Sequence, residues 1–278
     1  MDFKTKLAAA WAKNNSLLCV GLDPNIDKLP ENLMSSKTPF FDFGKAIIDA
    51  TADLVCAFKP NSAFYEARGA AGIEELKATC DYIRSKHPDT PVILDFKRGD
   101  IDSTNSHYTA FAFDYLQVDA VTVQPYEGRQ AFQPFLDRKD KGIIVLCRMS
   151  NPGSGEFQDL AVDGRKLYLQ VAENVVKQWN ANGNCLLVVG ATQPKELAEV
   201  RALVGNDMTL LVPGFGAQGG NAEATVRAGV TSDGTGLIIN SSRAILYASD
   251  GDDFAQAAQA AAQAARDEIN TYRKRAAS

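Results

Sequence analysis

Three charged side chains follow an apolar run in the first half of the chain. Asp95, Lys97 and Asp100 come within six positions of the apolar residues 92–94, a run typical of a strand that is buried on both faces. Because side chains alternate along a strand, Asp95 and Lys97 should point to the same side, and Asp100 follows where the strand should end. A single Asp or Lys at a strand end is commonly just solvated, but a structural strand has no use for this acid, base, acid order. The pattern therefore favours a chemical role for an ammonium group held between carboxylates.

The elements that would position these groups are indicated by eight short apolar runs, each typical of a buried parallel strand. The runs are 17–22, 55–59, 92–96, 120–123, 143–147, 186–189, 209–212 and 237–240. Between them, apolar residues recur at the spacing of one helix face over 43–54, 73–83, 167–179 and 197–203. Thr38 and Pro39 form a start signal for the first of these helices. An alanine-rich tail at about 253–274 predicts a closing helix, because alanine has the best helix propensity.

Eight strands that alternate with helices over about 250 residues indicate a (β/α)8 TIM barrel of the α/β class, with residues 1–278 as a single domain. A doubly wound parallel sheet is the alternative. Barrel enzymes place their chemistry at the C-terminal ends of the strands. Beyond the 95–100 segment, the residues at the ends of the predicted strands are Gly21-Leu22-Asp23-Pro24, Lys59-Pro60-Asn61, Arg148-Met149-Ser150, Pro213-Gly214 and Asn240-Ser241-Ser242-Arg243.

A glycine-rich segment after the seventh run predicts a phosphate site. Residues 214–219 match G-x-G-x-x-G, which taken alone would suggest a dinucleotide-binding fold. In such folds the motif follows the first strand, whereas barrels commonly bind a phosphate in the loops after strands seven and eight. Arg243, at the start of the short helix expected after the last strand, would complete the site as a bidentate donor. We therefore expect one bound phosphate group and no dinucleotide.

Residues 150–164 are dense in Gly, Ser and Pro and show no helical or strand period. A long ordered loop inside a compact domain is usually a lid or a binding loop. A surface insertion fits the composition equally well, but the position after the fifth strand favours a lid.

The bulk properties favour a small-molecule substrate. A net charge of −5, spread without runs, provides no electrostatic footprint for nucleic acid or an anionic membrane. The apolar run 7–11 near the N-terminus is too short for a signal peptide or a membrane span. The five cysteines are scattered without a C-x-x-C pair, as expected of free thiols in the cytoplasm.

The chain has only two histidines, His87 and His107. We expect His87 to cap the C-terminus of a helix and His107 to lie within the helix after the third strand. Neither a catalytic triad nor a His-rich metal site can be assembled from them. Aspartate and lysine must therefore carry the chemistry, and no metal is expected.

Taken together, the strand-end motifs resemble those of the orotidine 5′-phosphate decarboxylase family, and most of all its longer, bacterial-type branch. The resemblance runs nearly the full length, and the combination is highly specific. It rests on VGLDP at 20–24, FKPN at 58–61, DFKRGD at 95–100, CRMSNPG at 147–153, PGFGAQG at 213–219 and NSSR at 240–243. The chain departs from the family pattern at Phe215 and Asp102, where a smaller aliphatic residue and a glycine are expected. Neither departure removes a chemical group.

The resemblance implies a barrel without metal or cofactor that converts orotidine 5′-phosphate to UMP and CO2 as a homodimer, with its sites at the subunit interface. It implies that Lys97 donates a proton to C6 of the substrate and that Asp95 lies beside the substrate carboxylate. Asp23 and Lys59 would hold ribose hydroxyls and anchor the charge network. The other implied contacts are Ser150 to the pyrimidine, Gln218 and Arg243 to the phosphate, Pro213 and Ser242 to the substrate, and Asp100, Ile101 and Thr104 from the partner subunit.

Elementary chemistry agrees with these roles. Loss of CO2 leaves a carbanion in an orbital that the ring cannot conjugate, so its stabilisation must be electrostatic. Asp95 favours the ionised form of Lys97, because an opposite charge stabilises an ammonium group. The same lysine can then quench the carbanion as a general acid.

Three other hypotheses use the same residues. Related barrels that carry Asp-x-Lys-x-x-Asp are metal-dependent sugar-phosphate decarboxylases or aldol-type synthases, but they have an acidic Mg²⁺ ligand where this chain has Lys59, and a lysine would repel the cation. Schiff-base chemistry by Lys59 or Lys97 needs a neutral amine, which flanking carboxylates disfavour. A non-catalytic phosphate-binding barrel is the third hypothesis, but clustered charges lower the stability of a protein and would serve no function there.

Overall fold

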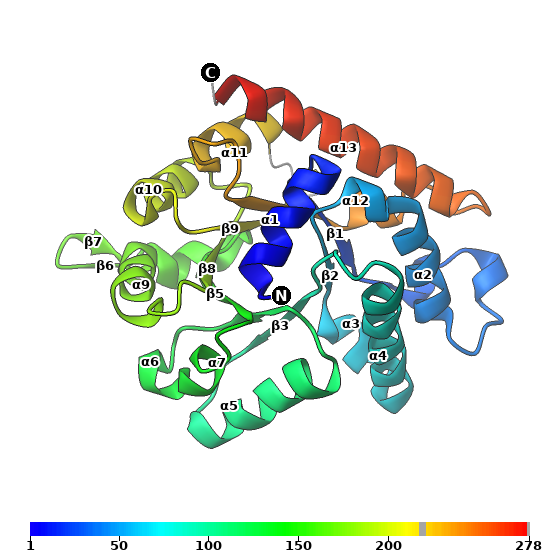
Figure 1. Ribbon diagram of the computed structural model, residues 1–278, viewed down its shortest axis with the longest axis horizontal. Helices are drawn as coiled ribbons and strands as arrows, with labels where there is room; N and C mark the ends of the chain where they lie inside the picture. The colour runs from blue at the N-terminus through cyan, green and yellow to red at the C-terminus, as the bar shows by residue number, and fades with distance from the viewer. Residues whose placement is uncertain (217–220, 277–278) are drawn as a thin grey trace.

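Eight parallel strands form the centre of the molecule (Figure 1). The computed structural model describes residues 1–216 and 221–276. Its strands run in the order β2-β1-β10-β9-β8-β5-β4-β3. They are β1 (Leu18–Leu22), β2 (Ala57–Pro60), β3 (Ile93–Arg98), β4 (Ala120–Val123), β5 (Gly142–Arg148), β8 (Cys185–Val189), β9 (Leu210–Pro213) and β10 (Leu237–Ser241). Each strand begins and ends within two residues of an apolar run predicted from the sequence.

The sheet closes on itself between its two end strands, β2 and β3. Isolated parallel bridges join Phe58 to Val92 and Asn61 to Asp95. The Phe58 N–H donates to the Pro91 carbonyl at 3.0 Å. The strands therefore form a nearly closed barrel surrounded by helices, which confirms the predicted (β/α)8 barrel against the doubly wound alternative.

Helices cover the outside of the barrel (Figure 1). The longer ones are α2 (Pro39–Thr51), α4 (Gly69–Lys86), α5 (Asp102–Thr109), α9 (Leu167–Asn174), α10 (Pro194–Val204), α11 (Ala222–Gly229) and α13 (Phe254–Ala276). The shorter ones are α3 (Ser62–Glu66), α6 (Gly128–Ala131), α7 (Gln133–Leu136) and α12 (Arg243–Leu246). Two π-helical turns, η4 (Ala110–Tyr115) and η6 (Val175–Trp179), extend α5 and α9.

The predicted helix start at Thr38-Pro39 and the predicted helix end at His87 are confirmed. α2 begins at Pro39 after its N-cap Thr38, and His87 is the C-cap of α4. His107 lies within α5, as predicted. None of the helices in residues 1–216 and 221–276 is long and apolar enough to span a membrane.

The sequence patterns did not indicate the first helix, α1 (Phe3–Asn14), which lies across the middle of the barrel in Figure 1. Its side chains Phe3 and Leu7 join a cluster of inward-facing strand residues such as Cys19 and Ile238. A Cβ atom at Gly142 would lie 2.5 Å from the Phe3 ring, so glycine is required there. α1 therefore closes one end of the barrel interior and leaves the other end for chemistry.

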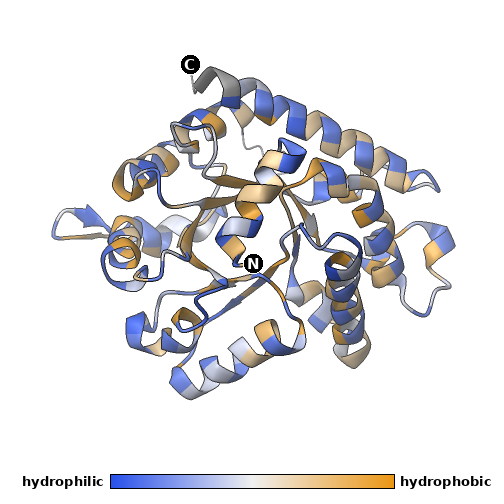
Figure 2. Cartoon of the chain, in the orientation of Figure 1, coloured by the Kyte–Doolittle hydropathy of each residue, from blue (hydrophilic) through white to orange (hydrophobic). Residues whose placement is uncertain are grey.

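A second and larger core lies between the strands and the outer helices. Figure 2 shows mostly hydrophobic central strands, and surrounding helices on which hydrophobic and hydrophilic residues alternate. This pattern is expected for parallel strands covered by amphipathic helices. All five cysteines are buried free thiols, namely Cys19, Cys56, Cys80, Cys147 and Cys185.

The segment 150–164 has more local structure than its composition indicates. It contains a 3-10 turn, η5 (Pro152–Ser154), and a short helix, α8 (Gly155–Gln158). A small antiparallel hairpin follows, formed by β6 (Ala161–Val162) and β7 (Arg165–Lys166). The buried Arg148 at the end of β5 fastens the segment by donating to Asp159 Oδ2 at 2.9 Å.

Candidate active site

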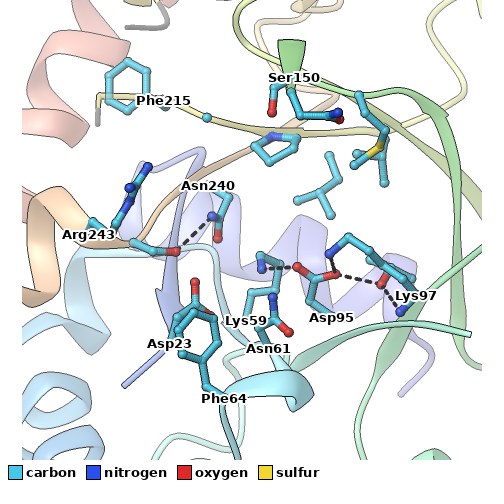
Figure 3. Close-up of a pocket in the computed structure, with 18 of the residues that line it drawn as sticks. Asp23, Lys59, Asn61, Phe64, Asp95, Lys97, Ser150, Phe215, Asn240 and Arg243 are labelled. Carbon is cyan, nitrogen blue, oxygen red and sulfur yellow. Dashed lines mark hydrogen bonds and ion pairs between the residues drawn. The ribbon is translucent and has the colours of Figure 1, made fainter. Parts of the chain in front are cut away.

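A cavity of about 490 Å³ opens at the C-terminal ends of the strands (Figure 3). This is the end at which barrel enzymes carry their catalytic residues. Its charged and polar lining includes Asp23, Asn25, Lys28, Lys59, Asn61, Asp95, Lys97, Thr122, Ser150, Asn240, Ser242 and Arg243. Its apolar lining includes Phe64, Leu146, Met149, Val188, Leu211, Pro213 and Phe215.

A charged array lies at one side of this cavity. Lys59 Nζ, from β2, donates to Asp95 Oδ2 at 2.6 Å, and Lys97 Nζ donates to Asp95 Oδ1 at 2.5 Å. The Thr122 hydroxyl on β4 donates to the same Oδ1 at 2.9 Å. Both oxygens of the Asp95 carboxylate are therefore engaged, and two ammonium groups are held on either side of it (Figure 3).

Burial and charge act in opposite directions on this array. Burial alone disfavours the ionised form of Asp95, but the Lys59 and Lys97 ammonium groups outweigh it and hold the pKa of the carboxyl well below its usual value. Burial likewise opposes the charge of Lys59, yet Asp95 and, more weakly, Asp23 raise the pKa of that ammonium above its usual value. Asp95 and Lys59 are thus ionised across the neutral range. The side chain of Lys97 is 37% exposed and that of Lys59 only 4%, so Lys97 faces the open part of the cavity.

The backbone at Lys97 is left-handed, with φ 44°. A non-glycine residue adopts this conformation only at a cost, and such residues cluster at functional sites. The Lys97 N–H donates to Thr122 Oγ1 at 3.1 Å, and Gln124 Nε2 donates to the Lys97 carbonyl at 3.3 Å. The register of β3 against β4 shifts between Leu94 and Arg98. The predicted strand therefore bends at Lys97, and the Lys97 side chain still lies on the same side as Asp95, which it contacts at 2.5 Å.

Asp23 directly follows β1, the strand that pairs with β2, so it lies beside Lys59 in Figure 3. Its Oδ1 atom is buried and has no hydrogen-bond partner in the described parts of the chain. The Tyr247 hydroxyl fixes the adjoining backbone, because it donates to the Asp23 carbonyl at 3.1 Å and accepts from the Asn25 N–H at 2.8 Å. The buried Asn240 also has an unpartnered oxygen and lines the same wall. This wall presents acceptors that suit ligand hydroxyl groups.

The predicted phosphate side lies at the far end of the cavity from Lys97 (Figure 3). Arg243 is the first residue of α12, as predicted, and it lines the cavity with Ser242 and Pro213. A Cβ atom at Gly21 would lie 1.8 Å from Ser242 Oγ, so glycine lets the ends of β1 and β10 approach each other. Gln218 lies outside the described residues.

The structure does not bring every predicted residue to this cavity. Asp100, Ile101 and Thr104 are absent from the lining. The Asp100 side chain instead accepts from the Ile101 N–H at 2.6 Å, and Ile101 is 65% exposed. Asn105 holds the turn by donating to the Asp100 carbonyl at 2.6 Å. This segment therefore does not line the cavity of its own chain.

Several lining residues were not identified from the sequence. Asn61 was visible as the last residue of a strand-end motif, and the inward position of Thr122 follows from strand alternation. Asn240 was visible in the same way, as the first residue of the motif NSSR at 240–243, but Phe64 and Tyr247 gave no comparable signal. Within residues 1–216 and 221–276, no group of three or more His, Cys, Asp or Glu side chains is placed to hold a metal ion.

Comparison with known proteins identifies the family. A family model described as "Orotidine 5'-phosphate decarboxylase / HUMPS family" matches residues 16–260. The chain belongs to this family. A curated protein of Azoarcus sp. (strain BH72) named orotidine 5'-phosphate decarboxylase is 57% identical over 273 residues, which cover 98% of this chain and 100% of that protein. Membership confirms the resemblance and the expected carboxy-lyase class.

Solved structures agree. The structure of Leishmania donovani OMP decarboxylase matches with a TM-score of 0.86 and 39% identity over 99% of both chains. The structure of Leishmania donovani UMP synthase matches with a TM-score of 0.88 and 41% identity. The match covers 98% of this chain but 57% of the synthase, so the present chain spans little more than half of that protein.

Proposed function

We propose that the protein decarboxylates orotidine 5′-phosphate to UMP and CO2 in pyrimidine biosynthesis, without a metal or an organic cofactor. The observation that carries the proposal is the Lys59–Asp95–Lys97 array at one side of the cavity. This arrangement supplies fixed positive charge beside a fixed carboxylate, in a site that a mononucleotide can enter. The decarboxylase names of close, full-length relatives support the same reaction.

Charge stabilisation is the main task of the array. As CO2 leaves, negative charge develops at C6 of the pyrimidine, in an orbital outside the ring π system. The Lys97 ammonium is already oriented by Asp95 at 2.5 Å, so it stabilises that charge without reorganising at the moment of reaction. Lys97 then donates its proton to C6 and completes UMP.

Lys59 and Asp23 would fix the ribose. The ammonium of Lys59 is buried against Asp95, and the unpartnered Asp23 oxygen at the end of the neighbouring strand β1 is available to a ribose hydroxyl. Lys59 also neutralises part of the charge of Asp95, which would otherwise repel the substrate carboxylate. Asp95 would lie beside the substrate carboxylate, where its role is to orient Lys97.

The phosphate would bind at the other end of the cavity, against Arg243, with Gln218, Ser242 and Pro213 nearby. Ser150 would contact the pyrimidine. Binding energy from the phosphate, which is remote from C6, can orient the ring and close the segment 150–164 as a lid. The anchor from Arg148 to Asp159 provides a fixed base for that movement.

Assembly as a homodimer completes the proposal. Asp100, Ile101 and Thr104 leave the cavity of their own chain, and Ile101 is exposed. We assign these residues to the active site of the partner subunit. The buried free thiols fit a reducing compartment, so we place the enzyme in the cytoplasm.

The alternatives predict different behaviour. A metal-dependent sugar-phosphate enzyme needs acidic ligands, but the ammonium of Lys59 lies against Asp95 at 2.6 Å. Schiff-base chemistry by Lys59 needs a neutral amine, whereas Asp95 raises the pKa of that group. A non-catalytic barrel would bind UMP without turnover.

One assay separates the proposed decarboxylation from these alternative functions. Loss of orotidine 5′-phosphate is followed by its absorbance with purified protein, with and without EDTA. We expect turnover that EDTA leaves unchanged. Strict metal dependence, or no decarboxylation by folded protein that binds UMP, would overturn the proposal.

A further inference from the structure

The barrel is closed least regularly between β2 and β3, a boundary that we call the β2–β3 seam. Here isolated bridges replace a continuous ladder. Lys59 comes from β2, whereas Asp95 and Lys97 come from β3. The 2.6 Å contact between Lys59 and Asp95 therefore crosses the seam, and its geometry depends on how the two strands are held together.

A second ion pair crosses the same seam outside the cavity. Arg98 Nη2, at the end of β3, donates to Glu66 Oε1, at the end of α3, at 2.5 Å. α3 begins two residues after the end of β2. Neither side chain belongs to the cavity lining, so neither touches a ligand there. The Arg98–Glu66 pair joins the two segments that carry Lys59 and Lys97.

Two aromatic rings also lie close to the Arg98 guanidinium group. Its guanidinium carbon lies 5.7 Å from the centre of the Phe96 ring and 5.6 Å from that of Tyr108. The two rings meet edge to face, with their centres 6.3 Å apart. Tyr108 lies on α5, so the Arg98 side chain connects α3, β3 and α5 in one orientation.

The pair adjoins the left-handed backbone of Lys97, which persists only if its surroundings over-determine it. Hydrogen bonds from β4 and the following loop fix one side of this bend, including the bond from the Gln124 N–H to the Arg98 carbonyl at 2.9 Å. Among the described residues, the Arg98–Glu66 pair is the only ion pair outside the cavity that connects this bend to α3, the helix after β2.

We propose that the Arg98–Glu66 pair is a positioning device for the catalytic array. By fastening α3 to the end of β3, it sets β2 against β3 and so places Lys59 and Lys97 around Asp95. The inference rests on the proposed decarboxylation. Because a displacement of about 1 Å can cost about 10²-fold in rate, the pair acts on kcat although it touches no ligand.

Arg98→Gln and Glu66→Gln test this assignment, with Arg98→Lys as the conservative variant. Arg138 provides a matched control: it pairs with Asp114 at 2.7 Å, its guanidinium carbon lies 5.9 Å from the Phe113 ring centre, and its side chain is 35% exposed, against 33% for Arg98. We measure kcat, KM, UMP affinity, unfolding temperature and oligomeric state for each variant and for Arg138→Gln.

We expect Arg98→Gln and Glu66→Gln to lower kcat by roughly 10-fold or more, while KM and UMP affinity change less than about 2-fold. Arg98→Lys should recover part of the rate. The double variant should lose no more than the worse single variant, because both changes break one contact. Arg138→Gln should keep wild-type kcat.

Three results would overturn the assignment: a loss of kcat no larger than that of Arg138→Gln, an effect confined to KM, or dissociation of the assembly by both Gln variants. If Arg98→Gln does not fold, the half-buried Glu66→Gln variant decides alone. Failure of the proposed function is distinguishable, because wild-type protein would then show no turnover at all.

Discussion

Asp95→Asn tests the buried array most directly, because it removes one charge and keeps the shape of the side chain. The substitution leaves Lys59 and Lys97 without their shared carboxylate. Lys97 can turn to water, since its side chain is 37% exposed, but Lys59 is only 4% exposed and cannot. Removing one partner of a buried pair typically costs about 3–5 kcal/mol. We expect the free energy of unfolding at pH 7 to fall by about that amount and turnover to fall by at least about 10³-fold.

The pH dependence of this loss has a definite sign. In the wild type, the lowered pKa of Asp95 contributes stability that is present above its unfolded value and is lost as the pH falls through the folded value. The raised pKa of Lys59 contributes stability that is present below its unfolded value and is lost only as the pH rises through the folded one. The contribution of the pair is therefore constant across the neutral range. In Asp95→Asn, burial is opposed only by the weaker attraction of Asp23 and should lower the pKa of Lys59, so the loss of stability should shrink as the pH rises toward 10.

Urea unfolding at pH 7 and pH 10 measures these differences. Asp114→Asn is the control, because Asp114 forms an exposed pair with Arg138 and should cost less than about 1 kcal/mol. The double variant Asp95→Asn/Lys59→Met should regain most of the stability and none of the activity. If Asp95→Asn costs less than about 1 kcal/mol at pH 7, the reasoning from a buried, mutually dependent array is refuted.

The remaining predictions concern the roles of single residues. Lys97→Ala should reduce turnover by at least about 10³-fold while UMP still binds, measured by single-turnover kinetics and calorimetry; near-normal turnover would show that the proton donor is misassigned. Arg243→Ala should weaken UMP by roughly 10- to 100-fold and uridine hardly at all, because a charge-assisted bond to phosphate is lost; equal losses would remove Arg243 from the phosphate site. Mixing inactive Lys97→Ala and Asp100→Ala subunits should restore one working site per mixed dimer, and no recovery would place all of the catalytic residues in one subunit.

The eight strands could be predicted closely because buried parallel strands are continuous apolar runs of limited length. Helix starts such as Thr38-Pro39 were readable because capping and proline act locally. α1 was missed because its burial is decided by the barrel end that it covers, not by a strong period of its own. The hairpin of β6 and β7 was missed because two-residue strands leave almost no pattern.

The sequence by itself determined which chemical groups the site contains and at which strand ends they lie. Asp95 and Lys97 are two residues apart, so strand alternation predicted that they lie on one side, and their contact confirms it. The tertiary structure decided that Lys59, 36 residues before Asp95, completes the array across the β2–β3 seam. It also decided that Asp100, five residues after Asp95, leaves the cavity. The physical reason is the left-handed bend at Lys97: beyond it the strand period no longer applies, and hydrogen bonds from β4 and the loop after it set the direction of the chain.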